Sequence, residues 1–370
     1  MYRNTWMEVN LDAVADNVRK LKEICGKKII AVLKADAYGC GDSHVARAVL
    51  EAGADMLAVS SLDEALMLRN EGYEGELLIL GATDPEDVPV MIENSISVPA
   101  YCPEWADAVV QKNPAGLKVH MKVDTGMNRI GFKTPEDLQK AFNELKEAGC
   151  LIEGIFTHFC CADFDEVFTN MQYDRFADAV ELLGHEFKWI HCDNSDATVW
   201  FKDPLSNACR IGISIYGINT YTDELRHPIS MHTTVTMVKE IMPGEKIGYS
   251  STYTAKKKEI IATLPVGYAD GFIRANKGRK VWCDGMECEV VGNVCMDQTM
   301  IRLEHAVPLN TPVEIFGPHI HLEDMAADHN TIPYEIICLI SGRVTRTYIW
   351  HGREEQEENA RLLKSTAIEV

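Results

Sequence analysis

Short apolar runs alternate with amphipathic segments along the first part of the chain. This alternation is typical of parallel strands joined by crossover helices, and eight strand–helix units predict an N-terminal (β/α)₈ barrel of the α/β class. The runs are Lys28 to Lys34, Met56 to Ser60, Leu77 to Leu80, Ile96 to Ala100, Leu117 to Val123, Ile152 to Phe159, Trp189 to Asp193 and Ala208 to Ile213.

The segment from Thr134 to Ala148 shows the helical half of the pattern. Leu138, Phe142 and Leu145 fall on one helical face. Thr134 supplies a predicted N-cap, and the proline and glutamate that follow it suit a first helical turn.

The pattern changes after about residue 230, where period-two segments predict a mainly β C-terminal domain. Asp284-Gly285 between two of these segments predicts a two-residue hairpin turn. We expect a helix from Pro333 to Ile340 with Thr331 as its cap. The predicted strands are Thr233 to Val238, Ile247 to Ala255, Glu259 to Val266 and Val281 to Val291.

These patterns place the barrel at residues 9–230 and the C-terminal domain at residues 231–370, with residues 1–8 packing against the second domain. The acidic run Glu354-Glu355-Gln356-Glu357-Glu358 is predicted to form a solvated helix face.

Charge excludes two classes of partner. The chain has 370 residues, with 36 Lys and Arg against 56 Asp and Glu, a net charge of −20. Such a field repels nucleic-acid phosphates and anionic lipid surfaces. No apolar stretch approaches the roughly 20 residues that a bilayer span needs, and the first residues have no signal-peptide core. We expect a cytoplasmic protein that binds neither nucleic acid nor membranes.

The 12 cysteines of this acidic chain are too sparse for a disulfide scaffold and are predicted to be reduced thiols. The densest cluster contains His158, Cys160 and Cys161, with His191 and Cys192 further on. It lacks the paired spacing of zinc sites, so we predict no metal.

Active sites of (β/α)₈ barrels lie at the carboxyl ends of the strands, where Lys34 ends the first run. A desolvated ammonium there would have a lowered pKa and could form a Schiff base. The alternative is a lysine that turns out to solvent where the strand stops.

Four later strand ends also carry polar or cationic groups, namely Arg129, His158, Asn194 with Ser195, and Arg210. Taken singly, His158 suits a core histidine and each arginine a surface ion pair. Their convergence on one face of the barrel favours a site. Ser195 and the backbone around Gly212 would follow strands seven and eight, where such barrels often bind phosphate.

Several blocks together resemble the alanine racemase family. Ala31 to Gly39 (AVLKADAYG) is similar to the pyridoxal-phosphate attachment motif, with Lys34 as the Schiff-base lysine. The order and spacing of all the blocks identify the chain as a member of that family, with its barrel and β domain. The other blocks are Lys122 to Gly131, Ile155 to Phe159, Asn194-Ser195, Arg210 to Gly212, Tyr249 to Ala255, Pro265 to Gly271 and Gly292 to Gln298.

The resemblance implies a homodimer with shared active sites. Lys34 is one catalytic base, and Tyr249 of the other subunit is the second. Two bases are needed because racemisation removes the α-proton from one face and returns it on the other. A phenol is a poor base at neutral pH unless cationic neighbours favour its anion, and His158 and Arg210 match the family's supporting pair. Without the family match, Tyr249 on a strand would suit core packing.

The resemblance also assigns the remaining positions. Arg210 faces the pyridine nitrogen of the cofactor. A guanidinium stays protonated and cannot accept a proton, so it leaves this nitrogen neutral and weakens the cofactor ring as an electron sink. A weaker electron sink limits transamination and decarboxylation. Arg129 contacts the cofactor's phenolic oxygen and the substrate carboxylate. Lys122 matches a position that is carbamylated in some members, the alternative being an ordinary lysine. The phosphate cradle comprises Tyr38, Ser195 and the amides of Gly212 and Ile213. Met296 and Asp297 are the partner subunit's contribution to the site, Met296 through its backbone amide near the substrate carboxylate, and Tyr268 matches a tyrosine near the entrance.

One position departs from the family pattern: Gly342 stands where many alanine racemases have a tyrosine that touches the phosphate and narrows the pocket. The sequence therefore predicts an L-/D-alanine racemase, which in a bacterium would serve cell-wall precursor synthesis, with a serine or broad-spectrum racemase as the nearest alternative. More distant alternatives are a barrel-fold pyridoxal-phosphate decarboxylase and a non-enzymatic pyridoxal-phosphate carrier. The Tyr249 and Arg210 blocks argue against the decarboxylase. The non-enzymatic carriers end near the barrel, whereas this chain continues into a C-terminal domain that contains Tyr249.

Overall fold

All eight predicted barrel strands are present in this computed structural model, which describes residues 3–356. They pair in parallel in the order β8-β7-β6-β5-β4-β3-β2-β9. The ring closes where Asn207 N donates to Ile190 O at 3.0 Å and Arg210 N donates to Asp193 O at 3.0 Å. The strands are β2 (Lys28–Val32), β3 (Met56–Val59), β4 (Leu77–Ile79), β5 (Ser97–Ala100), β6 (Lys118–Lys122), β7 (Leu151–Phe156), β8 (Trp189–His191) and β9 (Ala208–Ile211).

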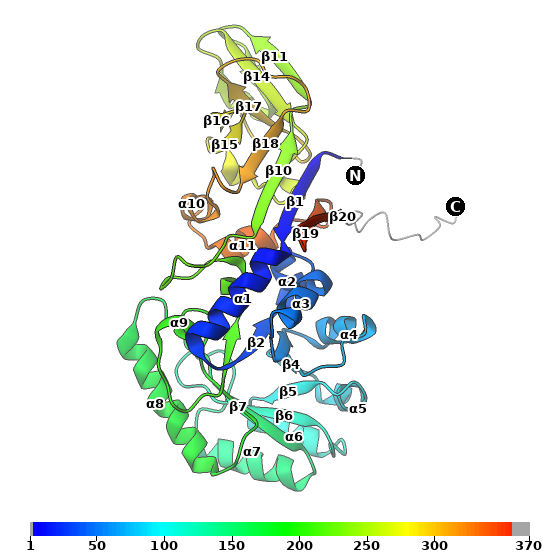
Figure 1. Cartoon of the computed structure of the whole chain (residues 1–370), viewed down its shortest axis with the longest axis vertical. Coiled ribbons are helices and arrows are strands. Elements are labelled where there is room, and N and C mark those ends of the chain that lie inside the picture. Colours follow the sequence, from blue (N-terminus) through cyan, green and yellow to red (C-terminus); the bar gives the residue numbers. More distant parts are fainter. Residues whose placement is uncertain (1–2, 357–370) are drawn as a thin grey trace, which may run out of the picture. The chain divides into compact units, whose positions relative to one another are not determined.

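Helices connect successive strands and lie outside them (Figure 1). The helix predicted around residue 140 is α7 (Pro135–Glu147), and its N-cap Thr134 accepts a hydrogen bond from Asp137 N as expected. Its buried face includes Leu138, Phe142 and Leu145. The other helices are α1 (Leu11–Cys25), α3 (Asp42–Glu51), α4 (Leu62–Asn70), α5 (Val88–Glu93), α6 (Pro103–Val110), α8 (Glu166–Leu183) and α9 (Ala197–Trp200).

The short element α2 (Lys34–Gly39) has an unusual backbone. Its residues Ala35 to Tyr38 have consecutive φ values of 57°, 56°, 49° and 59°, so the turn is left-handed. This hand costs an L-residue roughly 1–2 kcal/mol. Ala37 N donates to Leu33 O at 2.8 Å, and Tyr216 Oη donates to Ala37 O at 2.7 Å, which helps to hold the turn.

The chain divides into two compact units. One comprises residues 13–37 and 42–226 and contains the barrel, and the other comprises residues 3–12, 38–41 and 227–356. The second unit contains a ten-stranded sheet in the order β11-β14-β17-β16-β15-β18-β10-β1-β19-β20. Its strands are β1 (Thr5–Asn10), β10 (Ile229–Thr234), β11 (Met237–Ile241), β14 (Glu259–Leu264), β15 (Lys280–Cys283), β16 (Met286–Val290), β17 (Thr299–Leu303), β18 (Pro312–Phe316), β19 (Thr345–Trp350) and β20 (Arg353–Gln356).

The hairpin prediction is confirmed, because β15 and β16 pair with Cys283 opposite Met286 and leave Asp284 and Gly285 as the turn. Both turn residues have positive φ, 50° and 79°, as a type I′ turn requires. The helix predicted from Pro333 is α11 (Pro333–Cys338), which follows α10 (Leu322–Asp328).

Four local predictions are wrong. The first is the strand from Thr233 to Val238, which spans the end of β10, the break at Val235-Thr236 and the start of β11. Ile332, not Thr331, is the N-cap of α11, and the Thr331 hydroxyl instead donates to the Glu335 carboxylate. The strand predicted from Ile247 to Ala255 is broken by a 3₁₀ turn over Tyr249–Ser251, because Ser250 and Ser251 have positive φ. The pieces beside it are β12 (Lys246–Ile247) and β13 (Tyr253–Thr254).

The fourth error concerns the acidic run. Its residues 354–356 belong to β20, which pairs with β19, whereas residues 357 and 358 lie outside the described part. Among residues 3–356, no helix is long and apolar enough to cross a bilayer.

Candidate active site

Strand ends of the barrel bring the predicted lysine, histidine and arginine positions to one rim. Lys34 follows β2, Lys122 ends β6, His158 follows β7, Asn194 and Ser195 follow β8, and Arg210 lies in β9. The carboxyl ends of parallel barrel strands share one face, so the topology gathers these groups as predicted.

Arg210 is the most constrained of these side chains. Its Nη1 donates to His191 O at 2.7 Å and to His191 Nδ1 at 2.8 Å. Its Nη2 donates to Thr157 O, to Cys192 O and to His158 Nδ1, at 2.7, 3.0 and 3.1 Å. Burial lowers its pKa to about 10, so it remains charged at neutral pH. Within the described residues, Nε–H is left as the donor that can face a ligand.

His158 is held as a neutral base. Burial, followed by the positive charges of Arg210, Lys122 and others nearby, lowers its pKa well below 6.5. Because a guanidinium only donates, Nδ1 of His158 must be the acceptor, so its proton is on Nε2. His158 therefore presents an N–H donor on the side away from Arg210.

Lys122 is a buried amine in a cationic environment, with 4% of its surface exposed. Burial, then Arg210 and Arg129, lower its pKa well below 10.5. Its Nζ donates to Val123 O at 3.2 Å and lies 5.0 Å from the centre of the Phe156 ring. A lysine that loses its charge in this way is nucleophilic at neutral pH.

The loop after β6 positions Arg129. Asp124 Oδ1 accepts from Gly126 N at 3.1 Å and from Asn128 N at 2.9 Å, which ties the loop into a tight turn. Gly131 closes it, because a Cβ there would lie 2.6 Å from Asp124 N. Arg129 itself is exposed.

Ser195, Gly212 and Ile213, three of the positions predicted to form a phosphate cradle, follow β8 and β9. Ser195 Oγ accepts from Gly212 N at 3.0 Å, so this amide is already engaged. Ile213 N, at the start of a 3₁₀ turn, makes no hydrogen bond to another described residue. The Ser195 hydroxyl proton and the Ile213 amide are thus the donors available to an anion.

The Asn194 side chain hydrogen-bonds to the backbone on both sides: its Nδ2 donates to Phe159 O at 3.3 Å, and its Oδ1 accepts from Ala197 N at 3.0 Å.

Tyr38 belongs to the second unit, where its ring lies 5.9 Å from that of Tyr334, and burial raises the pKa of its hydroxyl.

The second unit brings together the positions predicted to face a partner subunit. Asn293 Nδ2 donates to Tyr249 O at 3.0 Å, which links the 3₁₀ turn to the segment that carries Met296. Tyr268 N donates to Cys295 O at 3.0 Å, and Ala269 N donates to Met296 O at 3.0 Å. This close approach of the two segments requires glycine at position 267, since a Cβ there would lie 2.3 Å from Cys295 O.

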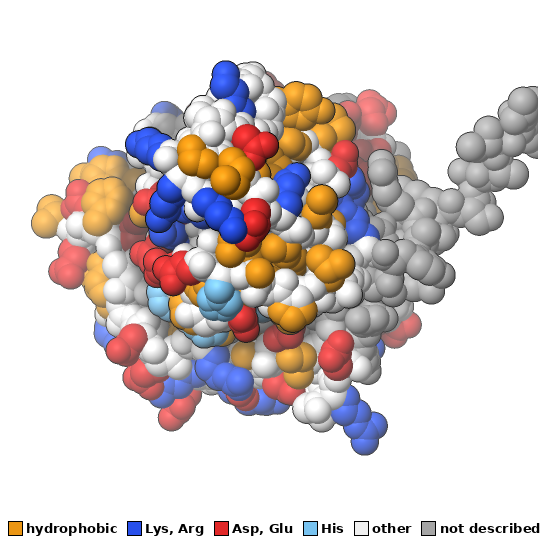
Figure 2. Space-filling view, turned by 90° about the horizontal axis from the view of Figure 1, so that it is seen from above, with side chains coloured by type: hydrophobic (Ala, Val, Ile, Leu, Met, Phe, Trp, Pro, Cys, Tyr) orange, Lys and Arg blue, Asp and Glu red, His pale blue; other side chains and the backbone are white. Residues whose placement is uncertain are grey.

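The side chains on this segment are exposed. Tyr249 is 74% exposed, Met296 53% and Tyr268 40%. Asp297 is held by Arg343, whose Nη2 donates to its Oδ1 at 2.6 Å. The face shown in Figure 2 intersperses hydrophobic side chains with acidic and basic ones. These three side chains would be shielded from water only if another protein surface covered them.

At Gly342, the direction that a Cβ would take is open, with no heavy atom within 4 Å. A tyrosine could therefore be introduced at this position without a clash at its Cβ.

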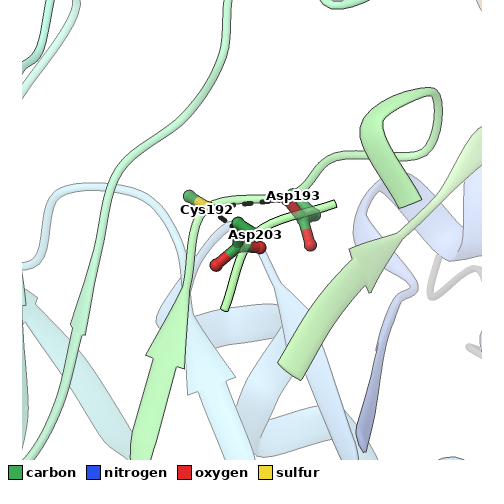
Figure 3. Close-up of side chains that lie close together, drawn as sticks. All are labelled: Cys192, Asp193 and Asp203. Carbon is green, nitrogen blue, oxygen red and sulfur yellow. Dashed lines mark hydrogen bonds between the residues drawn. The ribbon is translucent and has the colours of Figure 1, made fainter. Parts of the chain in front are cut away.

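A further cluster, which begins at the end of β8, has metal-ligand chemistry, namely Cys192, Asp193 and Asp203 (Figure 3). Lys27 Nζ already donates to Asp193 Oδ2 at 2.9 Å and to the Asp203 carboxylate. The cation for these carboxylates is thus a side chain of the chain itself.

Comparison with known proteins identifies the family. The family "Alanine racemase, N-terminal domain" matches residues 9–220, and "Alanine racemase, C-terminal domain" matches residues 229–348. The chain belongs to the alanine racemase family. An alanine racemase of Anoxybacillus flavithermus is 41% identical to it, over 98% of this chain and 99% of its own.

Solved structures agree with this assignment. Alanine racemase from Bacillus anthracis with bound L-Ala-P superposes with a TM-score of 0.92 at 38% identity, covering 96% of this chain and 98% of that one. A histidine racemase from Leuconostoc mesenteroides superposes at 0.86 and 29% identity, covering 94% and 99%. The same architecture thus also occurs in a racemase named for a larger amino acid.

The sequence analysis named His191 only in a cluster without metal spacing and did not single out His120, yet His191 contacts Arg210 and His120 contacts His191. A signal for both is present in the sequence, because His120 is the middle residue of β6 (KVHMK) and His191 is the polar last residue of β8 (WIH). Such a residue faces either the barrel interior or the helices, and one strand alone does not distinguish the two.

Proposed function

We propose that this chain interconverts L- and D-alanine with pyridoxal 5′-phosphate as its cofactor, Lys34 being the attachment residue. The observation that carries the proposal is the Arg210–His158 pair at the rim of the barrel where Lys34 follows β2, in a chain of this family. The residues present fit the cofactor: Ser195 Oγ–H and Ile213 N–H can hold its phosphate, and Arg210 Nε–H its ring nitrogen.

When bound, pyridoxal phosphate delocalises the electron pair left at the substrate α-carbon after the α-proton leaves. Lys34 takes or returns this proton on one face, and Tyr249 of a second subunit serves the other face. His158 donates its Nε2–H to the Tyr249 oxygen, which stabilises the phenolate that a base at neutral pH requires. Arg210 offers the ring nitrogen a donor but no transferable proton, which restrains side reactions.

Arg129 binds the substrate carboxylate, and Met296 and Asp297 of the second subunit complete the site, with Tyr268 near its entrance. The neutral amine of Lys122 is the form that adds CO₂, and a carbamate there would set a negative charge beside Arg129. Carbon-13 NMR of the folded protein in carbon-13-labelled bicarbonate tests this, since a carbamate carbon gives a signal that should disappear in Lys122→Arg.

We further propose that the protein is a cytoplasmic homodimer, and that in a bacterium its D-alanine enters cell-wall precursors. A broader racemase is the second candidate, because Gly342 leaves open space where relatives carry a tyrosine. A histidine racemase of the same architecture supports this candidate.

The deciding experiment follows chirality across a panel of amino acids with purified protein. We expect alanine to be racemised fastest, and we expect borohydride to remove the yellow colour and to leave the reduced cofactor covalently attached to Lys34. An adduct on another residue, or a Lys34→Ala protein that still fixes cofactor, contradicts the assignment. Racemisation of serine at the alanine rate supports the second candidate.

A further inference from the structure

Two histidines lie in line behind Arg210 inside the barrel. Arg210 Nη1 donates to His191 Nδ1 at 2.8 Å, and His191 Nε2 lies 3.0 Å from His120 Nδ1. Both histidines are 0% exposed, and they come from β8 and β6. The line therefore extends from the candidate site into the core of the barrel.

Because arginine only donates hydrogen bonds, it determines which ring nitrogen of each histidine in this line carries the proton. His191 Nδ1 accepts from the guanidinium, so neutral His191 carries its proton on Nε2. That Nε2–H donates to His120 Nδ1, so His120 in turn carries its proton on its own Nε2. Burial and the charge of Arg210 lower the pKa of His191 well below 6.5, and burial lowers that of His120 to about 3.

The surrounding structure is shaped to hold His120 in this position. A Cβ at Gly154, which faces His120 across β6 and β7, would lie 2.4 Å from its Nδ1 and block the hydrogen bond. The Phe156 ring stacks on His191 with centroids 4.8 Å apart and an interplanar angle of 10°. Among the described residues, Nε2 of His120 has no hydrogen-bond partner, so its place in the core rests on the bond at Nδ1.

We propose that His120 is a positioning residue for Arg210: it accepts the Nε2–H of His191 and so keeps Nδ1 of His191 turned toward the guanidinium. Without this acceptor, His191 has a buried, unpaired donor. Rotation of its ring to find another partner removes an acceptor from Nη1 and lets Arg210 shift. The catalytic consequence rests on the proposed function, whereas the hydrogen-bond order does not.

Three variants at one position separate hydrogen bonding from packing. In His120→Asn the amide oxygen can stand near the position of Nδ1 and accept the His191 proton. His120→Gln is equally polar but extends its amide toward the position of Nε2, and His120→Leu provides no acceptor. The holoenzymes are compared by nitrogen-15 NMR of labelled histidines and by alanine racemisation.

In the wild type we expect His120, His158 and His191 to show unprotonated Nδ1 and protonated Nε2. The hydrogen-bonded His191 Nε2–H signal should persist in His120→Asn and disappear in the Gln and Leu variants. Loss of alignment should lower kcat about 10- to 100-fold in those two with little change in KM, and His120→Asn should stay within a few-fold of wild type.

A protonated Nδ1 on His191, or equal kcat in the Asn, Gln and Leu variants, overturns the proposal. If His120→Leu does not fold, the comparison of Asn with Gln still decides. If the wild type racemises no amino acid, the proposed function fails, while the NMR signals still test the hydrogen-bond order.

Discussion

Arg210 determines the protonation of its neighbours, because each of its five N–H groups can only donate. It places the protons of His158 and His191 on their far nitrogens. His158 then faces outward as a donor. A phenolate has the complementary need, and this explains at the level of single atoms why a histidine and an arginine together support a tyrosine base.

The base role of Tyr249 can be tested by removing only its hydroxyl. Tyr249→Phe should lower racemisation in both directions by about 100- to 10,000-fold, the usual contribution of a general base. Exchange of the α-hydrogen of D-alanine with solvent, followed by NMR, should survive because Lys34 remains.

Tyr253→Phe is the matched control, because the Tyr253 hydroxyl donates to Glu259 at 2.6 Å and has no proposed catalytic role. If Tyr249→Phe racemises as fast as this control, the two-base scheme does not apply to the protein.

Substrate size should depend on Gly342. The open space at its Cβ permits Gly342→Tyr, which would restore a phenol ring and narrow the pocket. A change of this size in a pocket is worth about 1–3 kcal/mol, so the variant should penalise serine more than alanine. The measurement is the ratio of kcat/KM for the two amino acids. An unchanged ratio would mean that other residues set the pocket.

At the scale of secondary-structure elements, most of the predictions that the structure confirms are strands. All eight barrel strands and the Asp284-Gly285 hairpin follow from apolar runs and turn residues, which are local signals. The break at Ser250 and Ser251 was not predictable in this way, because it rests on two serines with positive φ. The His191–His120 contact was equally hidden, since it joins residues 71 positions apart.

The interior of the barrel should also make the fold sensitive to acid. The pKa of His120 is lowered to about 3 in the folded state, against 6.5 ordinarily. The unfolded chain therefore binds one more proton at this residue below pH 6.5, and stability falls as the pH falls. His120→Asn lacks this proton, so its free energy of unfolding should fall less steeply than that of the wild type, by about 1.4 kcal/mol per pH unit between about pH 6 and 4.

Urea unfolding at several pH values measures this slope. Equal slopes for His120→Asn and wild type would show that His120 is protonated in the folded protein.

For the whole molecule, the exposed Tyr249 segment and the barrel rim lie in different compact units. If a second subunit supplies Tyr249, two defects can complement each other. Lys34→Ala and Tyr249→Phe should each be nearly inactive, yet mixing them under subunit exchange should restore one intact site per heterodimer. Activity and exchange, the latter followed with a fluorescent label, are measured together. Exchange without recovery would place both bases in one chain.

The left-handed turn at Ala35–Tyr38 has a consequence for which substitutions the chain can accept. Ala35 and Asp36 are exposed, and exposed positions usually tolerate most residues. Here the backbone decides instead, because valine, isoleucine or threonine in this conformation is a genuine outlier, whereas glycine adopts it without penalty. In a library of substitutions at position 35, survival should follow backbone handedness rather than polarity or size. The residue types found in the lysine motif are thus in part set by its left-handed backbone.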